Sequence, residues 1–165
     1  MGKLWLDANV FMEAKNGYYA FDIAPGFWEA LQHGAKAGSI CCPMMVYDEI
    51  ARGGDELKVW AAEPKSFVLF AEADESVQKA FSKIAEAVTN GKSHHPAQAA
   101  LFLKGADPWV ISFAMANKGS VVTQEKLVGP DSKKVKIPNI CKHFGIEYMN
   151  SYDMLRRLGK KLSVV

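Results

Sequence analysis

Short apolar segments alternate with helical segments along this 165-residue chain, and that alternation limits the folds it can adopt. Strands that alternate with helices favour a parallel sheet with right-handed crossovers and helices on both faces. We predict five strands, in segments 3–9, 39–42, 66–70, 120–123 and 146–149. The fold class expected is therefore α/β, with three layers (α/β/α) around a central parallel sheet.

Helices are predicted between these strands from apolar spacing and from start and stop residues. They are expected at 10–15, from Pro25 to Gly34 or Gly38, from Pro43 to Gly53, and at 55–63, 76–90, 96–104, 107–118, 138–144 and 151–158. A chain of this length is expected to form a single domain, residues 1–165, with a sizeable buried core.

The first strand ends on a carboxylate. Leu4, Trp5 and Leu6 have no polar residue between them, as expected for a parallel strand covered on both faces. Asp7 ends this apolar run, and ligands bind outside the carboxyl ends of such strands. Asp7 is therefore either part of a functional site or a cap for the helix that begins near Asn9.

Two further acids lie near predicted helix starts. Asp48 and Glu49 are neighbours on one helix, about 100° apart, so at most one can face a shared site. Glu49 lies beside Ile50 on the apolar face and is the one we select. Asp107 precedes Pro108 and an apolar helix, which predicts an N-cap whose second oxygen remains able to bind a cation.

The fourth strand also ends on polar residues, Thr123 and Glu125. First and fourth strands can be neighbours at a switch point, which would gather Asp7, Glu49, Asp107 and Glu125 in one crevice. Converging carboxylates repel one another, and Mg²⁺ or Mn²⁺ relieves that repulsion. Such a site suits phosphodiester hydrolysis by one or two ions, with Asn9 and Thr123 orienting ligands or water.

Charge is distributed unevenly along the chain. Residues 1–125 carry 11 Lys and Arg against 15 Asp and Glu, whereas residues 126–165 carry 9 against 3. The basic end is either a solvated surface or a site for a polyanion such as RNA. The candidate RNA-binding residues are Lys133, Lys134, Lys136, Arg156 and Arg157.

Four motifs resemble those of the PIN-domain nucleases. They are Leu-Asp-Ala-Asn-Val-Phe at 6–11, Asp-Glu-Ile at 48–50, Ala-Asp-Pro-Trp-Val-Ile at 106–111 and Val-Val-Thr-Gln-Glu at 121–125. The similarity covers nearly the whole chain. Segments 13–28 and 134–139 resemble a PIN-like branch of largely uncharacterised bacterial and archaeal proteins.

The resemblance implies strand order 3-2-1-4-5, an acidic Mg²⁺ or Mn²⁺ site and ribonuclease activity. Many members of that family are toxins paired with an antitoxin protein, and homodimers are common among them. By position, Asp7, Glu49 and Asp107 match the family's acids, and Asn9 and Thr123 match its polar helpers. Glu125 departs from the pattern, because the fourth acid is often an Asp.

Two alternatives to a metal-dependent ribonuclease remain open. One is a PIN-like module that binds nucleic acid or protein without turnover. The other is a phospho-acceptor signalling domain, which would need an acceptor Asp at the end of the third strand, where Phe70 and Ala71 stand instead.

Other features of the sequence concern its surroundings in the cell. No apolar run approaches the roughly 20 residues of a membrane span, and no signal peptide is evident. We expect a cytoplasmic protein in which Cys41, Cys42 and Cys141 are buried thiols without zinc.

Overall fold

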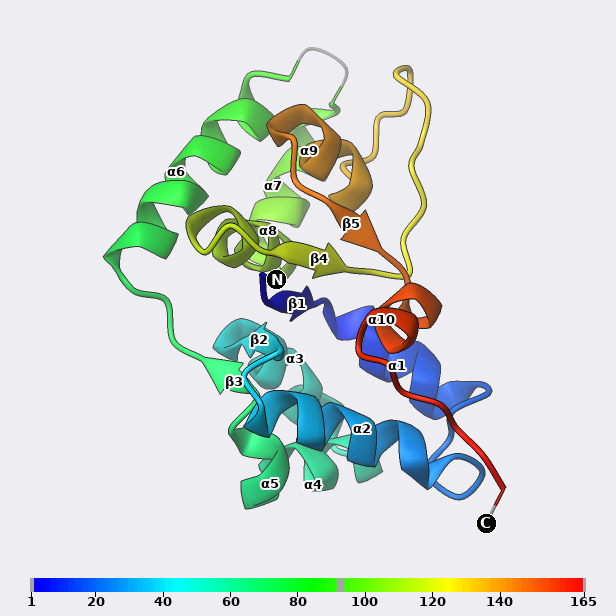
Figure 1. Cartoon of the computed structure of the whole chain (residues 1–165). Helices are drawn as coiled ribbons and strands as arrows, with labels where there is room; N and C mark the ends of the chain where they lie inside the picture. The colour runs from blue at the N-terminus through cyan, green and yellow to red at the C-terminus, as the bar shows by residue number, and fades with distance from the viewer. Residues whose placement is uncertain (1, 92–93, 165) are drawn as a thin grey trace.

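The five strands form one parallel sheet in the order β3-β2-β1-β4-β5 (Figure 1). The computed structural model describes residues 2–91 and 94–164. The strands are β1 (Leu4–Leu6), β2 (Ile40–Pro43), β3 (Phe70–Ala71), β4 (Ser120–Val122) and β5 (Tyr148–Met149). The predicted α/β/α class and the strand order implied by the resemblance are both confirmed.

Helices connect every pair of consecutive strands. They are α1 (Ala8–Asn16), α2 (Pro25–Lys36), α3 (Met44–Gly53), α4 (Glu56–Ala62), α5 (Pro64–Phe67), α6 (Glu75–Thr89), α7 (Pro96–Lys104), α8 (Asp107–Ala116), α9 (Ile137–Phe144) and α10 (Ser151–Arg157). Most begin where Pro, Asp or Asn can start a helix, and α3 and α9 end at glycines with positive φ, Gly54 and Gly145.

The third strand is present, but it begins at Phe70 rather than at Ser66 as predicted. Pro64 starts α5, and the Ser66 amide donates to the carbonyl of Glu63, so this segment turns as a short helix. Only Phe70 and Ala71 pair with β2, through Cys42 and Pro43. Proline at the first helical position, with its φ already suitable for a helix, accounts for the difference.

The two faces of the sheet are covered by different helices. Trp5 of β1 packs against Phe113 of α8, with ring centroids 4.7 Å apart, and α6 packs in turn on α8. Leu4 points the opposite way and lies in register with Ile40, whose side chain contacts Gly34 of α2. Alternation along β1 therefore places α8 and α2 on opposite faces.

The sheet residues and inner helix faces are buried in one hydrophobic cluster. Cys42 and Cys141 are buried free thiols as predicted, whereas Cys41 is only partly buried. Within the described ranges, no single helix is long and apolar enough to cross a membrane. The bent pair α7 and α8 matches such a span by length and composition alone.

Candidate functional site

Four carboxylates line one cavity of about 280 Å³ beside the carboxyl ends of β1 and β4. Asp7 follows β1, Glu49 lies on α3, Asp107 begins α8 and Glu125 follows β4. These strands point the same way in Figure 1, so their ends share one edge of the sheet. The predicted convergence of the four acids on one cavity is what the structure shows.

Asp7 is fully buried; it caps α1 and also lines the cavity. Its Oδ1 accepts from the Asn9 amide at 3.0 Å, which caps α1. Its Oδ2 accepts from Thr123 Oγ1 at 2.7 Å. Burial raises the pKa of Asp7 to about 6, opposed by these two hydrogen bonds and reinforced by Glu125 and Glu49.

Thr123 ties the ends of two strands together. Its hydroxyl donates to Asp7 and accepts from the Glu125 amide at 3.1 Å, so one side chain positions two of the acids. Thr123 is itself buried, whereas Asn9 is exposed and lines the cavity. Thr123 thus orients a carboxylate, as the sequence predicted for it, and Asn9 is placed to contact a molecule in the cavity.

Asp107 is not the N-cap that the Asp-Pro motif predicted. Ala106 takes that position in a helical conformation, and Asp107 is the first residue of α8. In the described part of the chain we find no hydrogen-bond donor to the Asp107 carboxylate. Pro108 at the second helical position lacks an amide hydrogen, so the helix start has one fewer donor to satisfy.

Burial, followed by the charges of Asp7, Glu125 and Glu49, raises the pKa of Asp107 to about 8. Lys136 partly opposes this rise. A helix N-terminus favours an anion by about 0.3–1 kcal/mol. Each pKa unit corresponds to about 1.4 kcal/mol. Burial and repulsion therefore outweigh the helix dipole, and Asp107 is largely protonated near neutral pH in the metal-free protein.

Glu49 reaches the cavity from α3, and its neighbour Asp48 points to solvent. Glu49 Oε1 accepts from the Ala106 amide at 3.0 Å, directly before α8. This bond joins α3 to the start of α8 and holds Glu49 next to Asp107. The choice of Glu49 over Asp48, made from the spacing of apolar residues, agrees with this placement.

Glu125 meets a cation from its own chain. Its Oε2 lies 3.2 Å from Lys136 Nζ, and its Oε1 accepts from the Ile137 amide at 3.4 Å. Lys136, one of the predicted RNA-binding residues, lines the carboxylate cavity and pairs with one of its four acids. This pairing could not be predicted from the sequence, because a polar loop separates the two residues.

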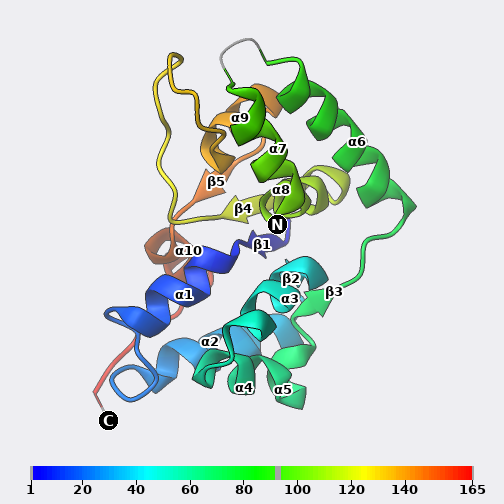
Figure 2. The same ribbon diagram turned by 180° about the vertical axis from the view of Figure 1, so that it is seen from behind.

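The other predicted RNA-binding residues lie outside the cavity lining. Lys133 and Lys134 are exposed on the segment between β4 and α9, which extends beside α9 in both views (Figures 1 and 2). Arg156 and Arg157 on α10 are paired with Asp153 and Glu147. The structure therefore does not gather the five basic residues around the acids.

Helix α7 supplies cavity residues that the sequence did not indicate. Gln98 and Phe102 are four residues apart on one side of α7, and both line the cavity together with Val135. Their spacing identifies a common helix face. Nothing in the sequence shows that this face turns towards the acids rather than the core.

The donor set suits a hard divalent cation, because all four side chains offer carboxylate oxygens and two are held at raised pKa. Within residues 2–91 and 94–164, no three His, Cys, Asp or Glu side chains are already close enough to hold an ion together. Glu49 and Glu125 are instead occupied with the Ala106 amide and Lys136. Ion binding would draw these two side chains inward from their present partners.

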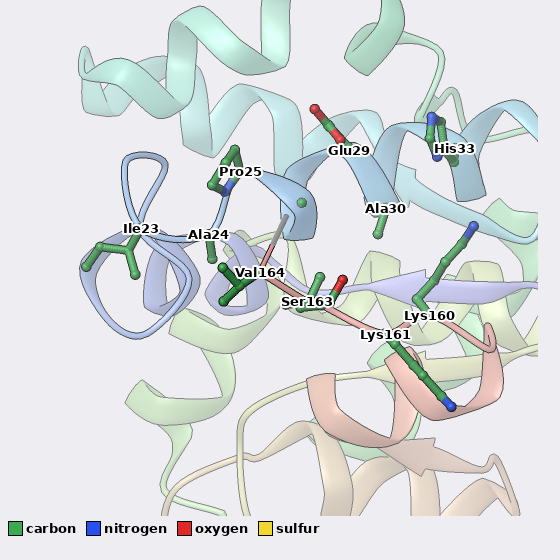
Figure 3. A pocket seen from close by; sticks show the side chains of 12 residues that line it. Ile23, Ala24, Pro25, Glu29, Ala30, His33, Lys160, Lys161, Ser163 and Val164 are labelled. Atoms are coloured by element: carbon green, nitrogen blue, oxygen red, sulfur yellow. The ribbon is translucent and has the colours of Figure 1, made fainter.

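A larger cavity of about 620 Å³ lies elsewhere, between the start of α2 and the C-terminal tail (Figure 3). Its ionisable residues are Glu29 and His33 on α2 and Lys160 and Lys161 on the tail. With one carboxylate against two lysines, it lacks the concentration of oxygen ligands found near Asp7. The smaller cavity is therefore the candidate site.

Comparison with known proteins gives one match. A family model described as a domain of unknown function (DUF4411) matches residues 4–162. No curated protein and no solved structure matches the chain. The matched range runs from β1 to the C-terminal tail and includes all four carboxylates.

Proposed function

Because the chain belongs to the DUF4411 family over nearly its whole length, we infer its function from its own cavity and propose a metal-dependent ribonuclease. The reaction proposed is hydrolysis of RNA phosphodiester bonds with Mg²⁺ or Mn²⁺. The resemblance of the four acidic motifs to PIN-domain nucleases supports this proposal independently of the family match.

One observation carries the proposal most directly. Four carboxylates from four separate segments line a cavity where Lys136 is the only cation among the lining residues described. In the metal-free protein, burial and the neighbouring acids raise the pKa of Asp107 to about 8, so a negative charge on Asp107 is energetically unfavourable there. Perturbed carboxylates that gather in a cleft are typical of a functional site.

The chain's own residues would share the work as follows. Asp7, already fixed by Thr123 and the Asn9 amide, would supply a ligand that needs no rearrangement. Asp107, without a described donor, would lose its proton and become the second ligand. When bound, Mg²⁺ or Mn²⁺ supplies Lewis-acid charge that activates water and stabilises charge at the phosphate.

Glu49 and Glu125 would complete the set by leaving the Ala106 amide and Lys136. Lys136, once released from Glu125, would be free to contact a phosphate of the substrate. Asn9, exposed at the cavity wall, would hold the attacking water or the RNA backbone.

The test is cleavage of single-stranded RNA in the presence of Mn²⁺, Mg²⁺ or EDTA. We expect cleavage with either ion, none in EDTA, and a loss of at least 100-fold in Asp7→Asn and Asp107→Asn. Asp48→Asn is the matched control, since Asp48 is a neighbouring acid that points to solvent, and it should cleave normally. Circular dichroism spectra of all variants establish that they are folded.

A second candidate function follows from the Lys136–Glu125 ion pair. Because Lys136 already neutralises one acid, the cavity can persist without metal, as a PIN-like module that binds nucleic acid or protein. RNA binding that is unchanged by metal, with no cleavage in any condition, would favour this module over the enzyme.

The resemblance also supports a role as the toxin of a toxin–antitoxin pair, with an antitoxin protein as partner. Induced expression should then arrest growth, and Asp107→Asn should abolish the arrest. A small gene directly upstream that encodes a DNA-binding antitoxin would identify the partner. Normal growth on induction of an active nuclease would contradict the toxin role while leaving the ribonuclease intact.

A further inference from the structure

A second cavity, of about 250 Å³, lies next to the carboxylates and is lined by three tyrosines. We call it the tyrosine cavity: Tyr18 and Tyr19 come from the segment after α1, and Tyr152 comes from α10. Glu13 of α1 and Gln124, directly after Thr123, add polar groups to its wall. None of these residues was among the predicted site residues.

The tyrosine cavity and the carboxylate cavity share two segments of the chain. At the start of α1, Ala8 and Asn9 line the carboxylate cavity, and Val10 lines the tyrosine cavity. After β4, Gln124 lines the tyrosine cavity, and Glu125 lines the carboxylate cavity. Adjacent residues therefore face the two cavities, and a ligand that occupied both would cross α1 and the end of β4.

The tyrosine rings divide into one that is fixed and two that are accessible. Tyr19 stacks on buried Phe27, with centroids 4.4 Å apart and planes 2° from parallel. Tyr18 is 85% exposed and Tyr152 is 47% exposed, although both are aromatic. Tyr152 lies at a steep angle to Tyr19, with centroids 6.4 Å apart and planes 63° from parallel, so Tyr19 does not stack on it. Neither ring is buried in the core, so core packing does not account for an aromatic residue at either position.

Polar groups beside the rings can donate hydrogen bonds to, and accept them from, the edges of a flat heterocycle. Gln124 Oε1 accepts from the Ser151 amide at 3.0 Å, which leaves its amide nitrogen to donate. Glu13 is exposed and offers carboxylate oxygens as acceptors. Arg156 is close enough to Tyr19 to oppose, by its positive charge, the rise in pKa that burial produces. A donor from Gln124 and an acceptor from Glu13 thus line the cavity beside the rings, and Arg156, paired with Asp153, lies near Tyr19.

We propose that the tyrosine cavity binds one unpaired nucleobase of the RNA, next to the phosphate held at the carboxylates. This inference rests on the proposed ribonuclease function and names the substrate feature that the protein selects. A base that stacks on Tyr18 or Tyr152 must have left its helix, because a paired base is already stacked on its neighbours. The protein therefore selects single-stranded RNA over a duplex.

The test measures binding rather than cleavage. Asp107→Asn protein, which is expected to lose cleavage, is titrated in Mg²⁺ into a fluorescein-labelled, ten-nucleotide single-stranded RNA and into the matching duplex, and anisotropy is recorded. In this background, Tyr18→Ala and Tyr152→Ala should each weaken single-strand binding by about 5- to 100-fold, the range for losing one stacked base. Duplex binding should be weaker at the start and unchanged by either substitution.

Three control variants make the result specific. Tyr18→Phe and Tyr152→Phe keep the ring and should bind within about twofold of the parent, as stacking requires. Tyr148→Ala removes a tyrosine that is 37% exposed on β5 and lies outside the cavity lining, so it should have no effect. All five substitutions at these exposed tyrosines are expected to leave the fold intact, which circular dichroism checks.

Unchanged single-strand binding in both alanine variants would overturn the base-binding proposal, as would a parent protein that binds no RNA. If the phenylalanine variants lost as much single-strand affinity as the alanine variants, the tyrosine hydroxyls rather than the rings would bind the RNA. That result would also overturn the base-stacking proposal. Ribonuclease function is tested separately. If single-strand binding depends on the tyrosines but no metal restores cleavage in the wild-type chain, the base site stands and the nuclease proposal fails.

Discussion

At the scale of single residues, the protonation of Asp107 governs the metal-free site. Its pKa of about 8 lies above the ordinary value of 3.8, first because of burial and then because of Asp7, Glu125 and Glu49. Between those two pH values the folded protein holds a proton that the unfolded chain has lost. Stability therefore falls as the pH rises from about 4 to about 8.

Asp107→Asn removes this ionisation with little change in shape. We expect it to raise the free energy of unfolding at pH 7.5, without metal, by on the order of 2 kcal/mol. The gain should become small near pH 4, where Asp107 is protonated in the folded protein and in almost half of the unfolded chains. Urea denaturation at the two pH values measures it, with Asp48→Asn as an exposed control that should change stability by less than about 0.5 kcal/mol.

The residues of the carboxylate cavity were largely predictable, but their partners were not. Asp7 and Glu125 each follow a strand, and topology alone brings such positions together. The missing N-cap role of Asp107 and the Lys136–Glu125 pair depend on side-chain positions that chain order does not determine.

For the Asp107→Asn variant, a greater gain in the free energy of unfolding at pH 4 than at pH 7.5 would contradict the raised pKa of Asp107.

At the scale of elements, the turn from α8 into β4 is closely packed against β1. A Cβ at Gly119 would overlap the Lys3 carbonyl oxygen and lie 2.9 Å from Trp5 Nε1. Both contacts belong to the segment that pairs β1 with β4, so neither can move without disturbing the sheet. The glycine is therefore required by proximity of backbone and side chain rather than by an unusual φ.

Gly119→Ala should destabilise the protein by about 1–3 kcal/mol through this overlap. Gly129→Ala is the matched control, because a Cβ there meets nothing within 4 Å, and it should be neutral or slightly stabilising. Chemical denaturation of both variants compares the two glycines directly. Equal stability of the two would show that the β1–β4 pairing tolerates the displacement.

Elements were predicted best where the sequence signal was long or had a proline at its start. The bounds of α7, Pro96–Lys104, agree with the prediction, and α6 differs by one residue at each end. Strands β3 and β5 contain only two residues each, which is too short for an alternating pattern to define. Pairing with a neighbouring strand decides such elements, and that information lies elsewhere in the chain.

At the scale of the whole molecule, ion binding is expected to be coupled to proton release. Asp107 must lose its proton to bind a cation, and near neutral pH it is mostly protonated. The apparent affinity for Mn²⁺ should rise by up to about tenfold per pH unit from pH 6 to 8 and level off above.

Titration calorimetry in buffers with different ionisation enthalpies counts the protons released. We expect about one proton per ion near pH 7 for wild type, and none from position 107 in Asp107→Asn. Mn²⁺ should also raise the Tm of wild type more than that of the variant, because binding stabilises only the folded state. An affinity that does not change with pH would contradict this coupling.

The fold class could be predicted from the sequence, but the position of the tyrosine cavity could not. Strand–helix alternation predicts the three layers, and the strand order came from the resemblance to PIN-domain nucleases. The tyrosine cavity, by contrast, joins the segment after α1 to α10, more than 130 residues later. No local pattern relates Tyr18 to Tyr152, so their proximity could be found only from the structure.

The hydrogen bond from Thr123 to Asp7 spans 116 residues, and this has a consequence for biosynthesis. Asp7 leaves the ribosome long before its partner Thr123 and before Glu125, because the chain is made from the N-terminal side. Until then β1 lacks β4 as a neighbour, and the set of four acids is incomplete. Translation thus delays assembly of the acidic centre until the chain beyond Glu125 has emerged.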